Sequence, residues 1–271
     1  MKYKLIVSDY DGTLAEIGAK CTINTQTVNA IKEYEKKGGK FVICTGRPFV
    51  SMRNLVKTYN LKGVIATVQG AYICNVETGE KLYEKGLSRE QALFVLEKFR
   101  TEENATPVVV YGEKLYCEKR DEPVLYYESA DKIVAEVVDS LEDLIKGANV
   151  IGKLMLLINP SDERMERIHE KFKGFSNEEL TFNYAGNYCY EAINTKFSKK
   201  EAVEFLIKYY NLTPNEVMAV GDSLNDVPLV SGTWHGVCVG DGSEELKKIA
   251  KEVTVPLKDN PIKVLIEKYC L

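Results

Sequence analysis

Residues 5–14 read LIVSDYDGTL, and this stretch decides the fold of the first part of the chain. Its apolar beginning, Leu5 to Val7, is typical of a strand that is buried on both faces. The run ends in two aspartates, Asp9 and Asp11, which are separated by a single tyrosine. Carboxylates are costly to bury unless a partner compensates their charge. The sequence therefore predicts a partner for these aspartates at the end of the strand.

The segments that follow alternate between strand-like and helix-like patterns as far as residue 70. Apolar runs at 40–46 and 63–70 are separated by helical patterns at 24–39 and 47–60. Asn24 or Thr25 can cap the first of these helices, which ends at a pair of glycines. This order of strands and helices predicts an α/β fold with a doubly wound, mostly parallel sheet.

The character of the sequence changes after about residue 84. A hairpin is predicted at Thr78–Gly79, and a helix that opens with a Ser88/Gln91 capping box follows it. Alternating, partly polar strands and longer helices then continue to residue 191, and the α/β pattern resumes at residue 192. We therefore predict a discontinuous core of residues 1–83 and 192–271, with an α+β module at 84–191 inserted into it.

Composition restricts the partners that the protein is expected to have. The 271 residues carry 36 basic and 40 acidic side chains in an interspersed pattern, for a formal charge of −4. An interspersed pattern forms no basic patch that would bind nucleic acid or an anionic membrane. A small molecule is therefore the expected partner, and no obligate protein partner is evident. The seven cysteines include no Cys-x-x-Cys pair, and no apolar stretch is long enough to cross a membrane. A cytoplasmic location is expected.

Polar side chains follow three of the predicted strands. The strand ends read SDYDG, CTGRP and VGDSLND, and they carry the residues Asp9, Asp11, Thr45, Asp222 and Asp226. Ligands of open α/β sheets bind just beyond the carboxyl ends of the strands, so these side chains are expected to meet at one edge. Several carboxylates at one edge repel each other unless a cation lies among them. Mg²⁺ suits such an all-oxygen set.

Other groups at these strand ends are suited to a phosphoryl oxygen. They are the Thr45 hydroxyl, backbone N–H groups near Gly12 and Gly46, the Asn225 amide and a lysine near a helix start. With this arrangement a carboxylate can attack phosphorus and form an acyl phosphate, which divides one difficult step into two. The adjacent carboxylate can give a proton to the leaving alcohol and later take one from water.

Four motifs, DYDGTL (9–14), TGRP (45–48), SKKEA (198–202) and GDSLND (221–226), resemble those of the haloacid dehalogenase (HAD) superfamily in order and spacing. The insert after the third strand and its hairpin is similar to the α+β cap of the Cof-type group (class IIB). The resemblance implies a Rossmann-like core with an inserted cap domain. It also implies a Mg²⁺-dependent phosphatase that hydrolyses small phosphorylated metabolites, such as sugar phosphates, through an aspartyl-phosphate intermediate.

The resemblance also implies roles for individual residues of the first two motifs. Asp9 would be the nucleophile and Asp11 the general acid/base, with the Tyr10 backbone N–H directed at the phosphate. Thr45 and the Gly46 N–H would help to hold the phosphoryl group.

The last two motifs complete the predicted site. Lys199 would bind the phosphoryl group, in preference to Lys196 or Lys200, and Asn225 would lie near the phosphate. Mg²⁺ would be bound by the Asp9 side chain, the Asp11 carbonyl and Asp222. Asp226 would either bind Mg²⁺ directly or contact the residues that bind it.

The chain departs from the family pattern at two places outside the motifs. It reads Gln69-Gly70-Ala71 where relatives often read Asn-Gly-Ala, and Gly240-Asp241-Gly242 where they often read Gly-Asn-Ala. These departures concern substrate preference and local loop structure. Arg47, directly after the second motif, is the candidate substrate contact.

Two other functions remain open at this point. A sugar phosphomutase of the same superfamily would return the phosphoryl group to another hydroxyl of the substrate. A receiver-type signalling module also joins an acidic cluster, a phosphoacceptor aspartate, a threonine and a lysine on a doubly wound sheet. The length of the chain and its insert argue against the signalling module. The sequence names neither the substrate nor the oligomeric state.

Overall fold

The structure is a computed structural model that describes residues 1–16, 22–186 and 188–271. The described chain forms two compact units. The first unit comprises Met1–Gly46, Val56–Leu82 and Ser198–Leu271, and the second comprises Arg47–Leu55 and Tyr83–Phe197. Cys21, one of the seven cysteines, lies outside the described residues.

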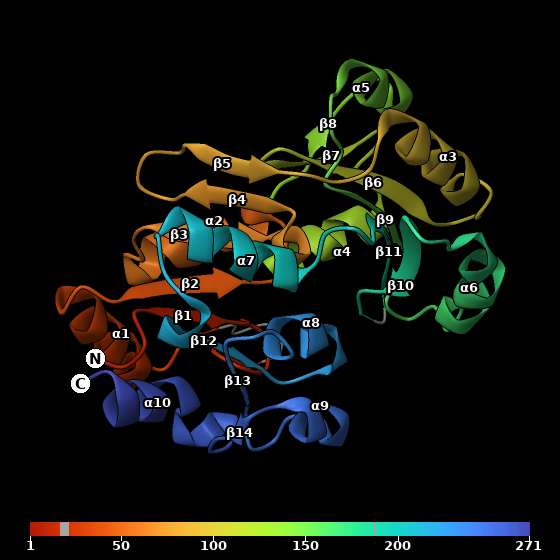
Figure 1. The fold of residues 1–271 in the computed structure, drawn as a ribbon. Coiled ribbons are helices and arrows are strands. Elements are labelled where there is room, and N and C mark those ends of the chain that lie inside the picture. Colours follow the sequence, from red (N-terminus) through yellow and green to blue (C-terminus); the bar gives the residue numbers. More distant parts are fainter. Residues whose placement is uncertain (17–21, 187) are drawn as a thin grey trace. The chain divides into compact units, whose positions relative to one another are not determined.

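An eight-stranded sheet forms the centre of the first unit (Figure 1), in the order β14-β13-β12-β1-β2-β3-β4-β5. Neighbouring strands from β14 to β3 are parallel, and β3 and β4 are antiparallel. The predicted doubly wound, mostly parallel sheet is therefore confirmed. Its strands are β1 (Leu5–Ser8), β2 (Lys40–Cys44), β3 (Val64–Thr67), β4 (Tyr72–Asn75), β5 (Lys81–Glu84), β12 (Val217–Gly221), β13 (His235–Cys238) and β14 (Glu252–Val253).

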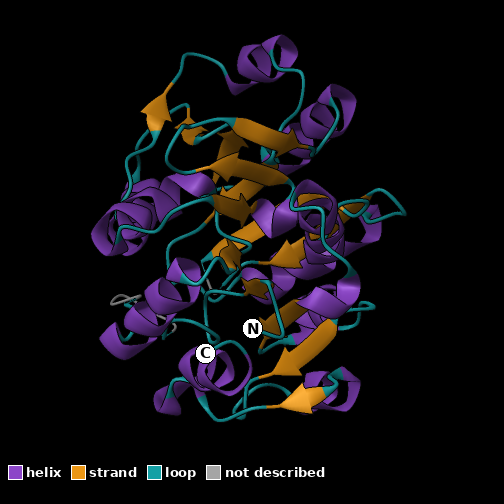
Figure 2. Ribbon diagram, turned by 60° about the vertical axis from the view of Figure 1, so that its left-hand side comes forward, coloured by secondary structure: helices purple, strands orange, loops and turns teal. Residues whose placement is uncertain are grey.

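Helices flank both faces of this sheet (Figure 2). They are α1 (Thr25–Lys36), α7 (Lys199–Tyr209), α8 (Val227–Val230), α9 (Glu244–Ile249) and α10 (Pro261–Tyr269). Helix α2 (Phe49–Tyr59) begins in the second unit and ends in the first. Helix α1 packs against α10, whereas α8 packs against both α7 and α9. The predicted cap of α1 is confirmed, because the Asn24 side chain accepts a hydrogen bond from the Gln26 N–H at 2.9 Å.

The second unit contains a six-stranded sheet in the order β10-β11-β9-β6-β7-β8. Its strands are β6 (Thr106–Tyr111), β7 (Lys114–Cys117), β8 (Glu136–Val137), β9 (Lys153–Leu157), β10 (Leu180–Tyr184) and β11 (Cys189–Asn194). Its helices are α3 (Arg89–Phe99), α4 (Glu122–Asp131), α5 (Leu141–Gly147) and α6 (Met165–Phe172). The Ser88/Gln91 capping box at the start of α3 is present as predicted. Phe99, Phe172 and Phe182 form an aromatic centre in its core.

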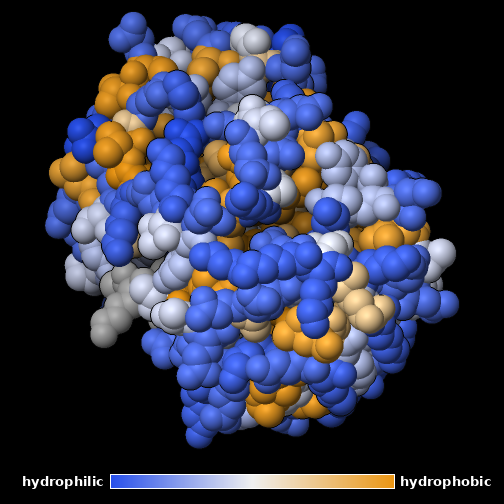
Figure 3. All heavy atoms as spheres, turned by 90° about the vertical axis from the view of Figure 1, so that its left-hand side faces the viewer, coloured by the Kyte–Doolittle hydropathy of each residue, from blue (hydrophilic) through white to orange (hydrophobic). Residues whose placement is uncertain are grey.

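Five short 3₁₀ segments complete the regular structure of the described residues: η1 (Val68–Gly70), η2 (Lys173–Phe175), η3 (Pro214–Glu216), η4 (Leu224–Asp226) and η5 (Leu257–Asp259). None of the described helices combines the length and the apolar character that crossing a membrane requires. Figure 3 shows one face of the molecule, where hydrophilic residues predominate and apolar residues form separate patches. Scattered apolar side chains of this kind are normal at protein surfaces.

Candidate active site

The carboxyl ends of β1, β2 and β12 lie at one edge of the first-unit sheet. In the parallel register, Ser8 of β1 is paired with Val220 of β12 and with Ile43 of β2. Asp9 therefore leaves β1 beside the ends of the other two strands, and its N–H donates a 2.9 Å hydrogen bond to the Val220 carbonyl oxygen. This register brings the first, second and fourth motifs to one edge of the sheet.

A tight turn follows the first aspartate. The Tyr10 carbonyl oxygen accepts hydrogen bonds from the N–H groups of Leu14 at 3.0 Å and Ala15 at 2.9 Å. The Tyr10 side chain is buried, whereas Asp11 is half-buried. The turn thus leaves Asp11 less buried than Asp9.

Gly12 lies in this turn, close to the Asp222 carboxylate. Its φ is +85°, and a Cβ at this position would be 2.5 Å from the Asp222 Oδ2. We expect Gly12→Ala to lower the free energy of unfolding by more than the about 1 to 2 kcal/mol that left-handed backbone alone costs an alanine. Gly38→Ala is the matched control, because Gly38 has φ +92° and, its chain neighbours aside, no atom of the described residues lies within 4 Å of an added Cβ. Equal losses in urea unfolding of the two variants would contradict the close contact.

Lys199 lies at the start of α7, where a Ser198/Glu201 capping box fixes the first turn of the helix. Its side chain is fully buried, and its Nζ donates to Asp9 Oδ1 at 2.5 Å and to Asp226 Oδ1 at 2.6 Å. One ammonium group thus bridges the carboxylate that follows β1 and the carboxylate in η4. The resemblance favoured Lys199 over Lys196 and Lys200, and in the structure Lys199 contacts the aspartates.

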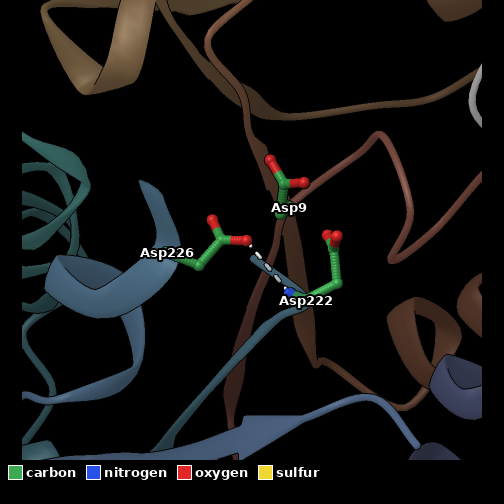
Figure 4. Close-up of side chains that lie close together, drawn as sticks. All are labelled: Asp9, Asp222 and Asp226. Atoms are coloured by element: carbon green, nitrogen blue, oxygen red, sulfur yellow. Dashed lines mark hydrogen bonds between the residues drawn. The ribbon is translucent and has the colours of Figure 1, made fainter. Parts of the chain in front are cut away.

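Figure 4 shows the side chains of Asp9, Asp222 and Asp226 close together, and we call these three residues the acidic cluster. Asp226 is completely buried, and its Oδ2 accepts from the N–H groups of Asp222 at 3.0 Å and Ser223 at 3.2 Å. Its other oxygen accepts from Lys199. Both oxygens of Asp226 are therefore engaged with the protein. Asp222 is half-buried, and its Oδ1 accepts from the Thr13 hydroxyl at 2.8 Å.

Burial and mutual repulsion dominate the electrostatics of the acidic cluster. Burial raises the pKa of Asp9, and the neighbouring Asp226 and Asp222 add to this rise against the opposing effect of Lys199. Burial likewise raises the pKa of Asp222 to about 6. Burial acts to lower the pKa of Lys199, but the carboxylates of Asp9 and Asp226 outweigh it and raise that pKa. Lys199 is thus charged, and it does not neutralise three carboxylates.

This donor set fits a magnesium ion. Each residue of the acidic cluster offers a carboxylate oxygen, and these oxygens lie within 4.8 Å of one another. Hard oxygen ligands are those that Mg²⁺ prefers, and the charge of a divalent cation would oppose the burial and repulsion that raise the pKa values of Asp9 and Asp222. Because both oxygens of Asp226 already accept hydrogen bonds from the protein, Asp9 and Asp222 are better placed to bind a cation.

Thr45 and Asn225, the two neutral side chains predicted at the site, differ in exposure. Thr45 is buried; its N–H donates to the Ala66 carbonyl oxygen at 3.0 Å, and its carbonyl oxygen accepts from the Gln69 N–H at 2.9 Å. Asn225 is exposed, and its Oδ1 accepts from the Ser223 hydroxyl at 2.5 Å. The backbone therefore fixes Thr45, whereas Asn225 is held by a neighbouring side chain.

Arg47 belongs to the second compact unit, unlike the other predicted site residues. Its guanidinium forms a 3.1 Å ion pair with Asp131 at the end of α4. The Ser51 hydroxyl donates to the other oxygen of the same carboxylate at 2.8 Å. The charge of Arg47 is thus compensated by a residue that the sequence analysis did not identify.

Sequence reasoning missed three residues that contact the predicted site. Thr13 lies within the first motif, but no role followed from the motif alone. Gln69 was noted only as a departure from the family pattern, although its N–H bonds to Thr45. No sequence pattern indicated Asp131, because nothing in the sequence places the end of α4 beside Arg47.

A comparison with protein families decides which family the chain represents. The model of the haloacid dehalogenase-like hydrolases matches residues 6–266. The chain belongs to the haloacid dehalogenase-like hydrolase family. The resemblance predicted from the four motifs is therefore confirmed.

Similar proteins support the enzyme class of this HAD-like hydrolase. It is 26% identical over 275 residues to phosphatase YwpJ of Bacillus subtilis, covering 93% of this chain and 94% of that protein. It is 25% identical over 248 residues to an HMP-PP phosphatase of Yersinia pseudotuberculosis, covering 91% and 87% of the two chains. A sugar phosphatase of HAD subclass IIB shares the fold, with a TM-score of 0.79, 22% identity and 98% of each chain covered. The predicted enzyme class, a phosphatase, is confirmed.

Proposed function

We propose that this protein is a Mg²⁺-dependent phosphatase that hydrolyses small phosphate monoesters through an aspartyl-phosphate intermediate. The observation that carries the proposal is the buried contact of Lys199 with Asp9, beside Asp222, at one edge of the sheet. The proposal keeps residues 1–83 and 192–271 as the catalytic core and residues 84–191 as the cap.

Asp9 and Asp11 carry the chemistry in this proposal. An Asp9 carboxylate oxygen attacks phosphorus, and the bond from phosphorus to the ester oxygen breaks. Asp11 gives its proton to the leaving alcohol. In the second step Asp11 takes a proton from water, the water oxygen attacks phosphorus, and inorganic phosphate leaves Asp9 regenerated. The half-buried position of Asp11 supports this assignment, because the group must exchange protons with solvent.

The phosphoryl oxygens are held by the Thr45 hydroxyl, the Lys199 ammonium, the Asn225 amide and the backbone N–H groups of Tyr10 and Gly46. These donors act where negative charge develops on the phosphoryl group. Lys199 is oriented by Asp226, and Thr45 is fixed by its backbone hydrogen bonds. Their rigidity supports the assignment, because preorganised donors need no rearrangement during the reaction.

Mg²⁺ would be held by the Asp9 and Asp222 side chains and by the Asp11 backbone carbonyl. When bound, it neutralises charge on the phosphoryl group and on the attacking carboxylate. Asp226 serves a different purpose, because it positions Lys199 and the backbone N–H of Asp222. Thr13 orients the Asp222 carboxylate through its hydroxyl.

The substrate class is a small phosphorylated metabolite, and sugar phosphates are the leading candidates. The similar proteins act on different compounds by name, one on a sugar phosphate and one on HMP-PP. The balanced surface charge favours a small molecule over nucleic acid. We place the protein in the cytoplasm, where the six cysteines described as free and buried stay reduced.

A panel of phosphate esters tests the proposal. We expect inorganic phosphate to be released with Mg²⁺, and this release to stop when a chelator removes the metal. Formation of an isomerised sugar phosphate without inorganic phosphate would instead identify a phosphomutase. A phosphorylated protein that persists for hours without turnover would identify a signalling module.

A further inference from the structure

The segment after β3 has an unusual backbone. Val68, Gln69 and Gly70 follow each other with φ values of +52°, +56° and +91°. A positive φ is a genuine outlier for a β-branched residue such as Val68, and it is uncommon for Gln69. Strained backbone of this kind persists only where the surrounding structure holds it, and it is concentrated at functional sites. The segment therefore warrants a search for what it holds in place.

One side of this segment contacts the turn that carries Thr45. The Gln69 N–H donates to the Thr45 carbonyl oxygen at 2.9 Å. The Gln69 side chain lies over Gly46, since its Nε2 would be 2.5 Å from a Cβ added there. The left-handed conformation thus places both the backbone and the amide of Gln69 against the second motif.

The other side of the segment contacts the helix that carries Lys199. A Cβ added to Gly70 would be 2.6 Å from the Ala202 Cβ and 3.0 Å from the Ser198 carbonyl oxygen. Gly70 therefore allows the segment to approach the first turn of α7 closely. The segment lies between Thr45 and the start of α7, and both of these carry phosphate ligands in the proposed function.

The amide of Gln69 is available for a ligand. Gln69 is half-buried, and its side-chain amide has no hydrogen-bond partner among residues 1–16, 22–186 and 188–271. A carboxamide offers both donors and an acceptor without adding charge. Hydroxyl groups, which also donate and accept, are its natural partners. A second anionic group would find only the two N–H donors and would be repelled by the carbonyl oxygen.

We infer that Gln69 determines specificity by hydrogen-bonding the leaving group of the substrate. The ligand class is a neutral, hydroxyl-bearing leaving group, such as a sugar or another polyol. The inference rests on the proposed function, because it assumes that the phosphoryl group lies beside Thr45, Gly46 and Lys199.

The experiment compares Gln69→Leu with the unaltered protein on glucose 6-phosphate and on 4-nitrophenyl phosphate, whose leaving group carries no additional hydroxyl. We expect kcat/KM for glucose 6-phosphate to fall at least tenfold, while kcat/KM for the aryl ester changes less than threefold. An equal fall for the two esters would overturn the inference, because it would show a general effect on the phosphate site.

Two further variants keep the test decisive if Gln69→Leu does not fold. Asparagine tolerates the left-handed region and retains the amide on a shorter side chain, so Gln69→Asn should show a smaller loss that is still selective for glucose 6-phosphate. Gln69→Glu should lower the activity on both esters, because its charge repels the phosphate. Gln26→Glu is the matched control for that charge, since Gln26 is exposed at the start of α1.

Failure of this inference and failure of the proposed function can be told apart. If the unaltered protein releases no phosphate from any ester, the proposed function fails. If it hydrolyses both esters and Gln69→Asn or Gln69→Leu lowers both rates equally, the inference alone fails.

Discussion

Asp9→Asn should abolish phosphate release, lowering kcat by about a thousandfold or more. The substitution keeps the shape of the side chain, but an amide cannot act as the attacking carboxylate. It also removes the negative charge that Lys199 contacts at 2.5 Å, so of the two carboxylates to which the ammonium donates in the described part of the chain, Asp226 remains. Steady-state release of inorganic phosphate at saturating Mg²⁺ measures the effect.

Asp139→Asn is the matched control, because Asp139 is exposed and lies in the second unit. It should retain the activity of the unaltered protein. Covalent phosphate can also be tested directly by rapid acid quenching with a ³²P-labelled ester. Label should be found on the unaltered protein and be absent from Asp9→Asn. Full activity of Asp9→Asn would rule out Asp9 as the nucleophile.

Lys199→Met should have the second large effect, and it should reduce both stability and activity. The methionine fills the volume of the lysine but removes the ammonium that contacts two buried carboxylates, Asp9 and Asp226. Removing one partner of a buried ion pair typically costs about 3 to 5 kcal/mol, because the remaining charge stays buried and unpaired. We expect a loss of this order in the free energy of unfolding, measured with urea in the absence of metal.

Lys200→Met is the control, because Lys200 is the next residue of α7 and its side chain is exposed. Its free energy of unfolding should change by less than about 0.5 kcal/mol. A Lys199→Met variant as stable as Lys200→Met would contradict the structural importance of the buried contact. If Lys199→Met is stable and folded but inactive, the role of Lys199 in binding phosphate would still be supported.

The sequence by itself determined the local elements and the residues at their ends. The apolar run at 5–7 and the caps at Asn24 and Ser88 predict β1, α1 and α3, because these patterns depend on neighbours a few positions away. The polar residues after β1, β2 and β12 were identified because they directly follow apolar runs, which is also a local pattern. Motif order was sufficient to predict the family.

The tertiary structure alone decided how these residues meet. Lys199 is distinguished from Lys196 and Lys200 by burial and by its contact with Asp9, and no local pattern sets a distance between residues so far apart in the sequence. The contact of Lys199 with Asp226 Oδ1 likewise depends on the tertiary structure, because the two residues come from α7 and η4. The left-handed conformation of Gln69 follows from packing between Thr45 and α7, which overrides the preference of the residue itself. Contacts of this kind arise from strand order and register, which sequence periodicity does not encode.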